Sequence, residues 1–383
     1  MQAPILSSPA AAYIRPDSVC PLYISPSQTP LKLTGLISPN LAFSPDSQVL
    51  AATDESGNHG LKLLNLKTGD PQQVVPTGWL GSISFSPDSQ RIATGSRGPM
   101  VALVDRQTPQ SVTRFEGHKR AVGNVAFSPD GQYIASSSRD NTVRVWNLQG
   151  KSIAMLQGFP EIPHVDLSGV NAIGIVTWSS SQNVLVTIAA SQRLERRLDL
   201  LQIPNANSNV KPITIDLPSE AADRSVPPFT VSSDGKHIAI LSKNGMELWN
   251  LQGQLIARWP IHPGAVIDLD FSPDGQKIVT TTEDKAVKIW SLQGQLLSTF
   301  TGYKKQVKHV KFSPDGKCLL TMGEEDRTIR GWDLSTQEEL FRLPTDGFEI
   351  TLSPNGRYLA TTEDDVVENS TTILVWQLQA QAQ

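Results

Sequence analysis

The sequence carries little charge and has no excess of either sign. Charged residues make up 18% of its 383 residues, and 33 basic side chains stand against 37 acidic ones, for a net charge of −4. Globular chains typically carry about 25% charged residues, and such a deficit suits a strand-rich protein. Because nucleic acid and anionic lipid attract strongly basic proteins, the balance argues against nucleic acid as a partner.

Cysteine is scarce as well. The two cysteines, Cys20 and Cys318, lie far apart in the sequence and resemble neither a disulfide framework nor a Cys-x-x-Cys metal or redox pair. The first residues lack the basic segment of a secretory signal and are interrupted by Pro4 and Pro9. These features predict a reducing, cytoplasmic location.

Long apolar runs and ligand-binding motifs are missing too. The longest uncharged stretch, residues 167–192, contains several Ser, Gln and Asn residues, so we expect no membrane insertion. The six histidines show no His-x-x-x-His or His-Glu-x-x-His spacing, and no Gly-rich phosphate loop is present. The sequence therefore predicts no metal site and no cofactor.

What the sequence does contain is a repeat. Phe-Ser-Pro-Asp or a weaker echo of it begins at eight positions: Phe43, Phe85, Phe127, Trp178, Val231, Phe271, Phe312 and Leu352. The spacings run from 40 to 53 residues, close to the roughly 40 to 45 residues of a four-stranded propeller blade. In the clearest unit, Pro129-Asp130-Gly131 forms a hairpin turn between alternating apolar strands.

Four antiparallel strands cannot bury both faces alone, so the units must stack around an axis. This predicts an all-β fold, a single β-propeller of eight four-stranded blades, or seven if the degenerate fourth unit is a loop. The last unit lacks a fourth strand, and residues 31–35 resemble one, so we expect the N-terminal strand to close the ring. The expected organisation is a Pro-rich tail or strapping arm with little that packs (1–29), the propeller (30–378) and a C-terminal tail (379–383).

One unit carries a family signature. Gly117-His118, Asp140 and Val145-Trp146-Asn147 match in order and spacing the motif of the WD-repeat β-propeller family, which the chain resembles over about residues 30–378. His262, Asp284 and Trp290 repeat the same offsets, and Tyr303 replaces the histidine in the seventh unit. Leucine or valine stands near the tryptophan position in units one, two and four, at Leu64, Val104 and Leu198. The Leu-Gln-Gly runs are similar to those of bacterial WD-repeat proteins.

The same residues admit a catalytic interpretation. His118, Ser138 and Asp140 could form a Ser-His-Asp hydrolase set. In the family that the chain resembles, however, such residues form a hydrogen-bonded chain that ends on the tryptophan, here Trp146, and satisfies buried polar groups. Its echo in His262, Thr280 or Thr282, Asp284 and Trp290 favours a repeated structural device.

We letter the four strands of each unit a to d in chain order. The resemblance also places the loops between strands b and c, and those from strand d to the next strand a, on one face, which we call the top face. The Pro-Asp-Gly hairpins lie on the opposite, bottom face. Charge segregates around that face, with a basic side in units two to five and an acidic side in units six to eight and unit one, unless these turns are charged by chance. The partner-binding residues that we expect are Arg97, Lys119, Arg120, Arg139, Lys243, Glu283 and Glu325, with Ile267, Lys308 and Phe348 at the channel mouth.

These features predict a non-enzymatic scaffold, or a subunit of a larger complex, that binds a protein or peptide partner on its top face. The alternative is a propeller enzyme or cofactor-binding protein that uses the central channel. A channel enzyme needs converging polar groups, and the inner strands offer Asn124, Asp268 and Asp270 as candidates.

Overall fold

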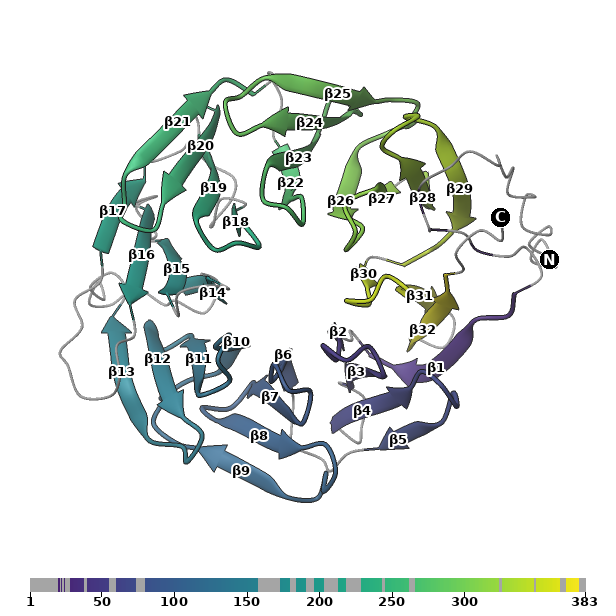
Figure 1. The fold of residues 1–383 in the computed structure, drawn as a ribbon. Helices are drawn as coiled ribbons and strands as arrows, with labels where there is room; N and C mark the ends of the chain where they lie inside the picture. Colours follow the sequence, from purple (N-terminus) through teal and green to yellow (C-terminus); the bar gives the residue numbers. More distant parts are fainter. Residues whose placement is uncertain are drawn as a thin grey trace.

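The computed structural model describes residues 20, 22, 24, 28–37, 40–54, 60–73, 80–157, 173–179, 184–190, 196–202, 213–217, 229–242, 245–261, 266–323, 326–347, 349–365 and 370–378. Its strands form eight four-stranded sheets, arranged as the blades of one ring (Figure 1). The predicted all-β, eight-bladed propeller is confirmed. No helix in the described ranges is long and apolar enough to cross a membrane.

Seven blades are built from consecutive strands, with the first strand innermost and the fourth on the rim (Figure 1). Blade one consists of β2 (Leu41–Phe43), β3 (Val49–Asp54), β4 (Gly60–Asn65) and β5 (Pro71–Gln73). Blade two consists of β6 (Leu80–Phe85), β7 (Arg91–Ser96), β8 (Val101–Asp105) and β9 (Val112–Phe115). Blade three consists of β10 (Val122–Phe127), β11 (Tyr133–Ser138), β12 (Thr142–Asn147) and β13 (Ser152–Gln157). Blades four and five consist of β14 (Ile173–Trp178), β15 (Val184–Ala190), β16 (Arg196–Gln202), β17 (Ile213–Leu217); and β18 (Phe229–Val231), β19 (His237–Ser242), β20 (Gly245–Asn250), β21 (Leu255–Trp259). Blades six and seven consist of β22 (Val266–Phe271), β23 (Lys277–Thr282), β24 (Val287–Ser291), β25 (Leu296–Phe300); and β26 (Val307–Phe312), β27 (Cys318–Gly323), β28 (Thr328–Asp333), β29 (Glu339–Pro344).

Blade eight joins the two ends of the chain. It contains β30 (Ile350–Leu352), β31 (Tyr358–Asp365) and β32 (Ser370–Gln377), and its outer strand is β1 (Leu31–Leu36). β1 pairs antiparallel with β32, with Leu31 opposite Val375 and Leu33 opposite Ile373. The predicted closure by the N-terminal strand is confirmed, and it covers an edge of β32 that would otherwise be exposed.

Blade four settles the choice between eight and seven blades. β16 pairs with β15 on one side and β17 on the other, so this unit is a complete sheet. The register corrects one assignment, because Leu201 faces Leu185 as Trp146 faces Ile134 in blade three. Leu201, three residues after Leu198, therefore occupies the tryptophan position.

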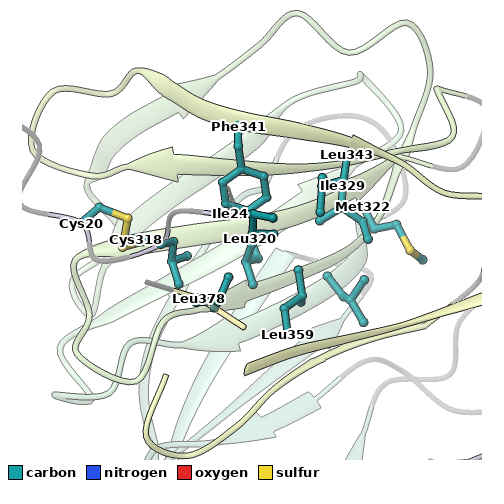
Figure 2. Packing of buried hydrophobic residues seen from close by; sticks show 12 residues of the cluster. Cys20, Ile24, Cys318, Leu320, Met322, Ile329, Phe341, Leu343, Leu359 and Leu378 are labelled. Carbon is teal, nitrogen blue, oxygen red and sulfur yellow. A yellow bond between two sulfur atoms is a disulfide. The ribbon is translucent and has the colours of Figure 1, made fainter. Parts of the chain in front are cut away.

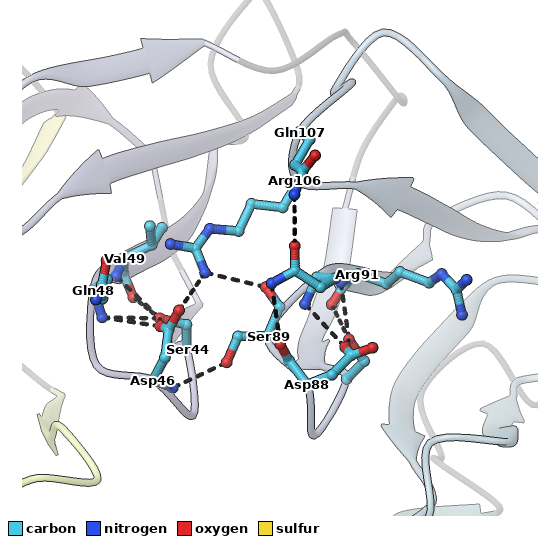
Figure 3. Close-up of polar contacts among 11 residues, drawn as sticks. Ser44, Asp46, Gln48, Val49, Asp88, Ser89, Arg91, Arg106 and Gln107 are labelled. Carbon is cyan, nitrogen blue, oxygen red and sulfur yellow. Dashed lines mark hydrogen bonds and ion pairs between the residues drawn. The ribbon is translucent and has the colours of Figure 1, made fainter.

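The Ser-Pro-Asp turns hold the inner hairpins together and also link neighbouring blades. In blade one, Ser44 Oγ donates to Asp46 Oδ1 at 2.5 Å and accepts from the Val49 amide at 3.0 Å. The Asp46 amide donates to Ser89 Oγ of blade two at 2.9 Å, and Arg106 bonds to both the Asp46 carboxylate and the Ser89 carbonyl (Figure 3). The Ser-Pro-Asp turns that mark the repeat therefore also connect blades one and two on the bottom face.

The two cysteines correct the sequence interpretation. Cys20 and Cys318 form a disulfide, with their Cα atoms 5.4 Å apart, because the ring brings the N-terminal arm against blade seven. Cys20, Leu22 and Ile24 are buried, so the arm packs more than its composition predicted. The cytoplasmic location stays a prediction, and disulfides are typical of oxidising compartments or of redox-sensing pairs in reducing ones.

Candidate functional site

A buried hydrogen-bond chain supports the top face of blade three. Trp146 Nε1 donates to Ser136 Oγ at 2.8 Å, Ser136 Oγ lies 2.8 Å from His118 Nε2, and His118 Nδ1 lies 3.0 Å from Asp140 Oδ2. Ser136, not the predicted Ser138, links histidine to tryptophan. The reason is the register: Trp146 faces Ile134, so its indole reaches Ser136, whereas Ser138 ends the strand and donates to the Arg120 carbonyl at 3.0 Å.

The chain of contacts suits a structural role better than catalysis. Burial lowers the pKa of His118 below its ordinary value, against the opposing effect of Asp140, so the imidazole is neutral at pH 7. A neutral ring that donates from Nδ1 to Asp140 accepts at Nε2 from the Ser136 hydroxyl. Ser136 has 0% of its surface exposed and its oxygen already accepts from Trp146. Such a hydroxyl cannot reach a substrate without breaking the blade.

Blades six and seven build the same device with other residues. In blade six, Trp290 Nε1 donates to Thr280 Oγ1 at 2.9 Å, while Thr282 bonds to Asp284. His262 lies outside the described residues. In blade seven, Trp332 Nε1 donates to Thr321 Oγ1 at 3.2 Å, and the Tyr303 hydroxyl lies 2.9 Å from the same oxygen. Tyr303 therefore stands where blade three has His118.

The top loops of blades two and three are held side by side by backbone contacts. The Val122 amide donates to the Gly98 carbonyl at 3.2 Å, and the Arg139 amide donates to the Ala121 carbonyl at 2.9 Å. Two glycines permit the close approach, because a Cβ on Gly95 would lie 2.6 Å from the Val122 carbonyl oxygen and one on Gly81 would lie 2.7 Å from that of Gly123. Three loops from two blades thus meet on the top face.

These three loops carry a cluster of exposed basic side chains, which we call the basic patch. It consists of Arg97, Lys119, Arg120 and Arg139. The nearby carboxylate of Asp140 is already engaged, because it accepts from the Lys119 amide at 2.8 Å and from the Thr142 hydroxyl at 2.6 Å, beside its contact with His118. Among the described residues, no ion pair joins the side chains of Lys119, Arg120 or Arg139 to a carboxylate. Their charge therefore faces solvent.

The other predicted contact residues are only partly placed. Glu283 is exposed on the b–c turn of blade six, and Ile267 and Lys308 are half-buried on the inner strands β22 and β26. Lys243, Glu325 and Phe348 lie outside the described residues. Of the acidic contact residues predicted on the top face, only Glu283 lies in the described ranges.

The channel carries ionisable groups that the sequence interpretation did not assemble. On β22 and β26, Asp268 Oδ2 lies 3.6 Å from His309 Nδ1 and Asp270 Oδ1 lies 3.7 Å from Lys311 Nζ. Glu349, just before β30, interacts with the charge of His309. The alternation Asp-x-Asp in one unit and His-x-Lys in the next was the available signal, because alternate residues of a strand point to the same face of its sheet. Here these residues meet between β22 and β26.

Burial raises the pKa of two carboxyl groups near the channel. It raises the pKa of Glu349 to about 7, with His309 and the Leu41 amide opposing the shift. Burial also raises the pKa of Asp270 against the effect of Lys311, while the Lys311 pKa rises because Asp270 and Asp268 outweigh its burial. No three His, Cys, Asp or Glu side chains of the described segments gather as metal ligands would.

The channel aspartates also have a structural task. The Val310 amide donates to Asp268 Oδ2 at 3.0 Å, which ties β26 to the neighbouring inner strand. Ser82 and Ser84 accept from the Val125 and Phe127 amides of blade three in the same way, at 2.7 and 3.0 Å. The inner strand of a blade is an edge strand, and in blades three and seven side chains from the preceding blade accept from its free amides.

The fold is a β-propeller, and buried side-chain hydrogen bonds to a tryptophan join strands within blades three, six and seven. The family model described as WD domain, G-beta repeat, matches residues 109–147, 253–291 and 294–333. Each match starts before the outer strand of one blade and ends with the third strand of the next, so the sequence repeat bridges two blades. These three segments are similar to WD repeats of the WD40 type. No curated protein matches the sequence.

Proposed function

We propose that the protein is a non-enzymatic scaffold that binds an acidic surface of a protein or peptide partner on its top face. The basic patch carries this proposal, because its side chains are exposed and the carboxylate of Asp140, next to Arg139 in the sequence, is occupied by internal hydrogen bonds. Exposed charges of one sign steer association and orient a partner of the opposite sign. The WD40 repeats support a binding role, since this fold commonly serves in protein interaction.

Rigidity of the patch supports the same role. Arg120 and Arg139 both sit on loops whose backbones are hydrogen-bonded to neighbouring elements. Loops that are ordered before binding lose less conformational entropy when the partner docks. The propeller thus offers a surface that is already in its binding geometry.

The test begins with affinity capture of the partner from the native organism, followed by surface plasmon resonance. Arg120→Glu with Arg139→Glu should slow association at least tenfold at low salt and less at high salt, because salt screens exposed charges. The matched control is Lys236→Glu with Lys317→Glu, which reverses two exposed charges on the bottom face and should leave association unchanged. Equal binding by the top-face variant, or loss with the bottom-face variant alone, would reject the proposal.

A second candidate is a ligand or catalytic site in the channel, favoured by the cluster of Asp268, Asp270, His309, Lys311 and Glu349. A thermal-shift screen of small charged metabolites would detect it. Stabilisation of the wild type that is lost in Lys311→Met would favour the channel. Screening without such a hit would leave the top face as the better proposal.

A further inference from the structure

The N-terminal arm is built into the seam between blades seven and eight. Leu22 is 2% exposed and Ile24 is 4% exposed, and both belong to a cluster with side chains of β27, β28 and β29 of blade seven and of β30 and β31 of blade eight. Figure 2 shows Ile24 beside Leu320 and Phe341, with the disulfide at one end of the cluster. We call Cys20, Leu22 and Ile24 the strap.

Two bonds attach the first residue of the strap to blade seven. One is the disulfide from Cys20 to Cys318, the first residue of β27. The other is a hydrogen bond from the Cys20 amide to Asp333 Oδ2 at 3.3 Å. The other oxygen of Asp333 accepts from the amides of Ser335 and Thr336, so the strap is tied to the same carboxylate that shapes the c–d turn of blade seven.

The position of the disulfide changes how the ring is closed. Between blades one and seven, each blade follows the previous one along the chain. The ring is completed in blade eight, where hydrogen bonds join β1 to β32. With the disulfide formed, the chain from Cys20 to Cys318 is itself a covalent circle that runs through β1, blades one to six and β26 of blade seven. With the disulfide reduced, the ring depends on non-covalent contacts alone.

We propose that the Cys20–Cys318 pair is a redox-controlled clasp of the propeller. A dithiol reductant attacks one sulfur as its thiolate and forms a mixed disulfide, and its second thiol then displaces the remaining protein sulfur. Two electrons and two protons pass to the protein, which ends with two thiols while the reductant becomes a disulfide. An oxidised dithiol protein reverses the exchange.

Burial determines how the clasp responds. Cys318 is 0% exposed and Cys20 is 4% exposed, so a reductant reaches the sulfurs only after the strap lifts from the seam. Local opening of this kind is expected for a short segment held by few side chains. Reduction then leaves β1, which follows the strap, free to separate from β32 more often.

Hydrogen exchange measured by mass spectrometry on the full chain tests the clasp. The protein is purified without reductant, and one half is treated with dithiothreitol or with a thioredoxin-type dithiol protein. Reduction should speed exchange in β1 and β32 at least tenfold and leave β11 and β12 of blade three unchanged. Reoxidation should restore the slow rates.

Two variants keep the test decisive. Cys20→Ser leaves Cys318 in the core and should exchange like the reduced wild type, whether or not a dithiol is present. Leu22→Ala keeps both cysteines and should accelerate reduction of the disulfide, because it weakens the strap. Three outcomes would each overturn the proposal. The first is two free thiols in protein that was never exposed to reductant, and the second is a disulfide in the native protein that neither dithiol reduces. The third is equal hydrogen exchange of β1 and β32 in the oxidised and reduced forms.

Discussion

Blades three and eight reach the same four-stranded form by different means. Blade three is one continuous stretch of chain, and its top is locked by the contacts from Trp146 through Ser136 and His118 to Asp140. Blade eight takes β30, β31 and β32 from one end of the chain and β1 from the other. Trp376 faces Leu359, as Trp146 faces Ile134, but no hydrogen bond in the described part of the blade engages its indole.

The two blades differ in the length of chain that their strand pairing closes. A continuous blade closes only short loops, and its internal polar chain removes unsatisfied buried groups. A blade assembled from both termini brings together residues more than 300 positions apart, as the Leu31 to Val375 pair shows. Long-range closure costs conformational entropy, and the strap with its disulfide supplies stabilisation next to this blade.

The largest expected effect comes from removing residues 1–36. The truncated chain loses β1, the strap and the disulfide together, and closure of a loop this long is worth about 5 kcal/mol. Differential scanning calorimetry should show a midpoint lower by on the order of 10 °C. An unchanged midpoint with a closed ring would refute the view that blade eight depends on both ends of the chain.

Glu349, beside the inner strand of blade eight, should make stability depend on pH. Its pKa is raised from 4.5 to about 7, so the folded state favours the protonated acid. That stabilisation is complete below pH 4.5, declines as the pH rises to 7 and is absent above it. Relative to Glu349→Gln, the wild type should therefore lose at most about 3 kcal/mol over this range.

Urea unfolding at several pH values between 4.5 and 8 measures this difference. The advantage of Glu349→Gln should grow with pH and level off above pH 7. Glu283→Gln is the matched control, because Glu283 is exposed on the top face, and its stability difference should stay flat. A constant difference for Glu349→Gln across the range would mean that folding does not raise the pKa of this carboxyl.

His118→Ala should have the smaller effect, confined to blade three. Removal of the imidazole leaves Ser136 and Asp140 each without one partner, which costs about 1 to 3 kcal/mol. Denaturant unfolding should show this loss, while partner binding per folded molecule should survive. A variant with unchanged stability would contradict the structural role, and an esterase activity abolished by this change alone would support the catalytic interpretation.

Much of the fold could be read from the sequence because its signals are local. The Ser-Pro-Asp turns and the alternation of apolar residues mark hairpins within a few residues, and their spacing sets the number of blades. The resemblance of residues 31–35 to other fourth strands was enough to predict closure by β1, which pairs with β32.

Contacts that depend on strand register or on distant units were decided by the tertiary structure alone. Ser136 and Ser138 lie on the same face of β11, so alternation in the sequence does not distinguish them. Ser136 binds the Trp146 indole because Trp146 lies opposite Ile134 in the sheet. The gathering of Asp268, His309 and Glu349 depends on three blades meeting at one axis. Cys20 and Cys318, 298 residues apart, become neighbours only when the ring closes. Sequence periodicity determines each blade, because its turns and strands are short-range, whereas the closed ring determines which side chains of different blades meet.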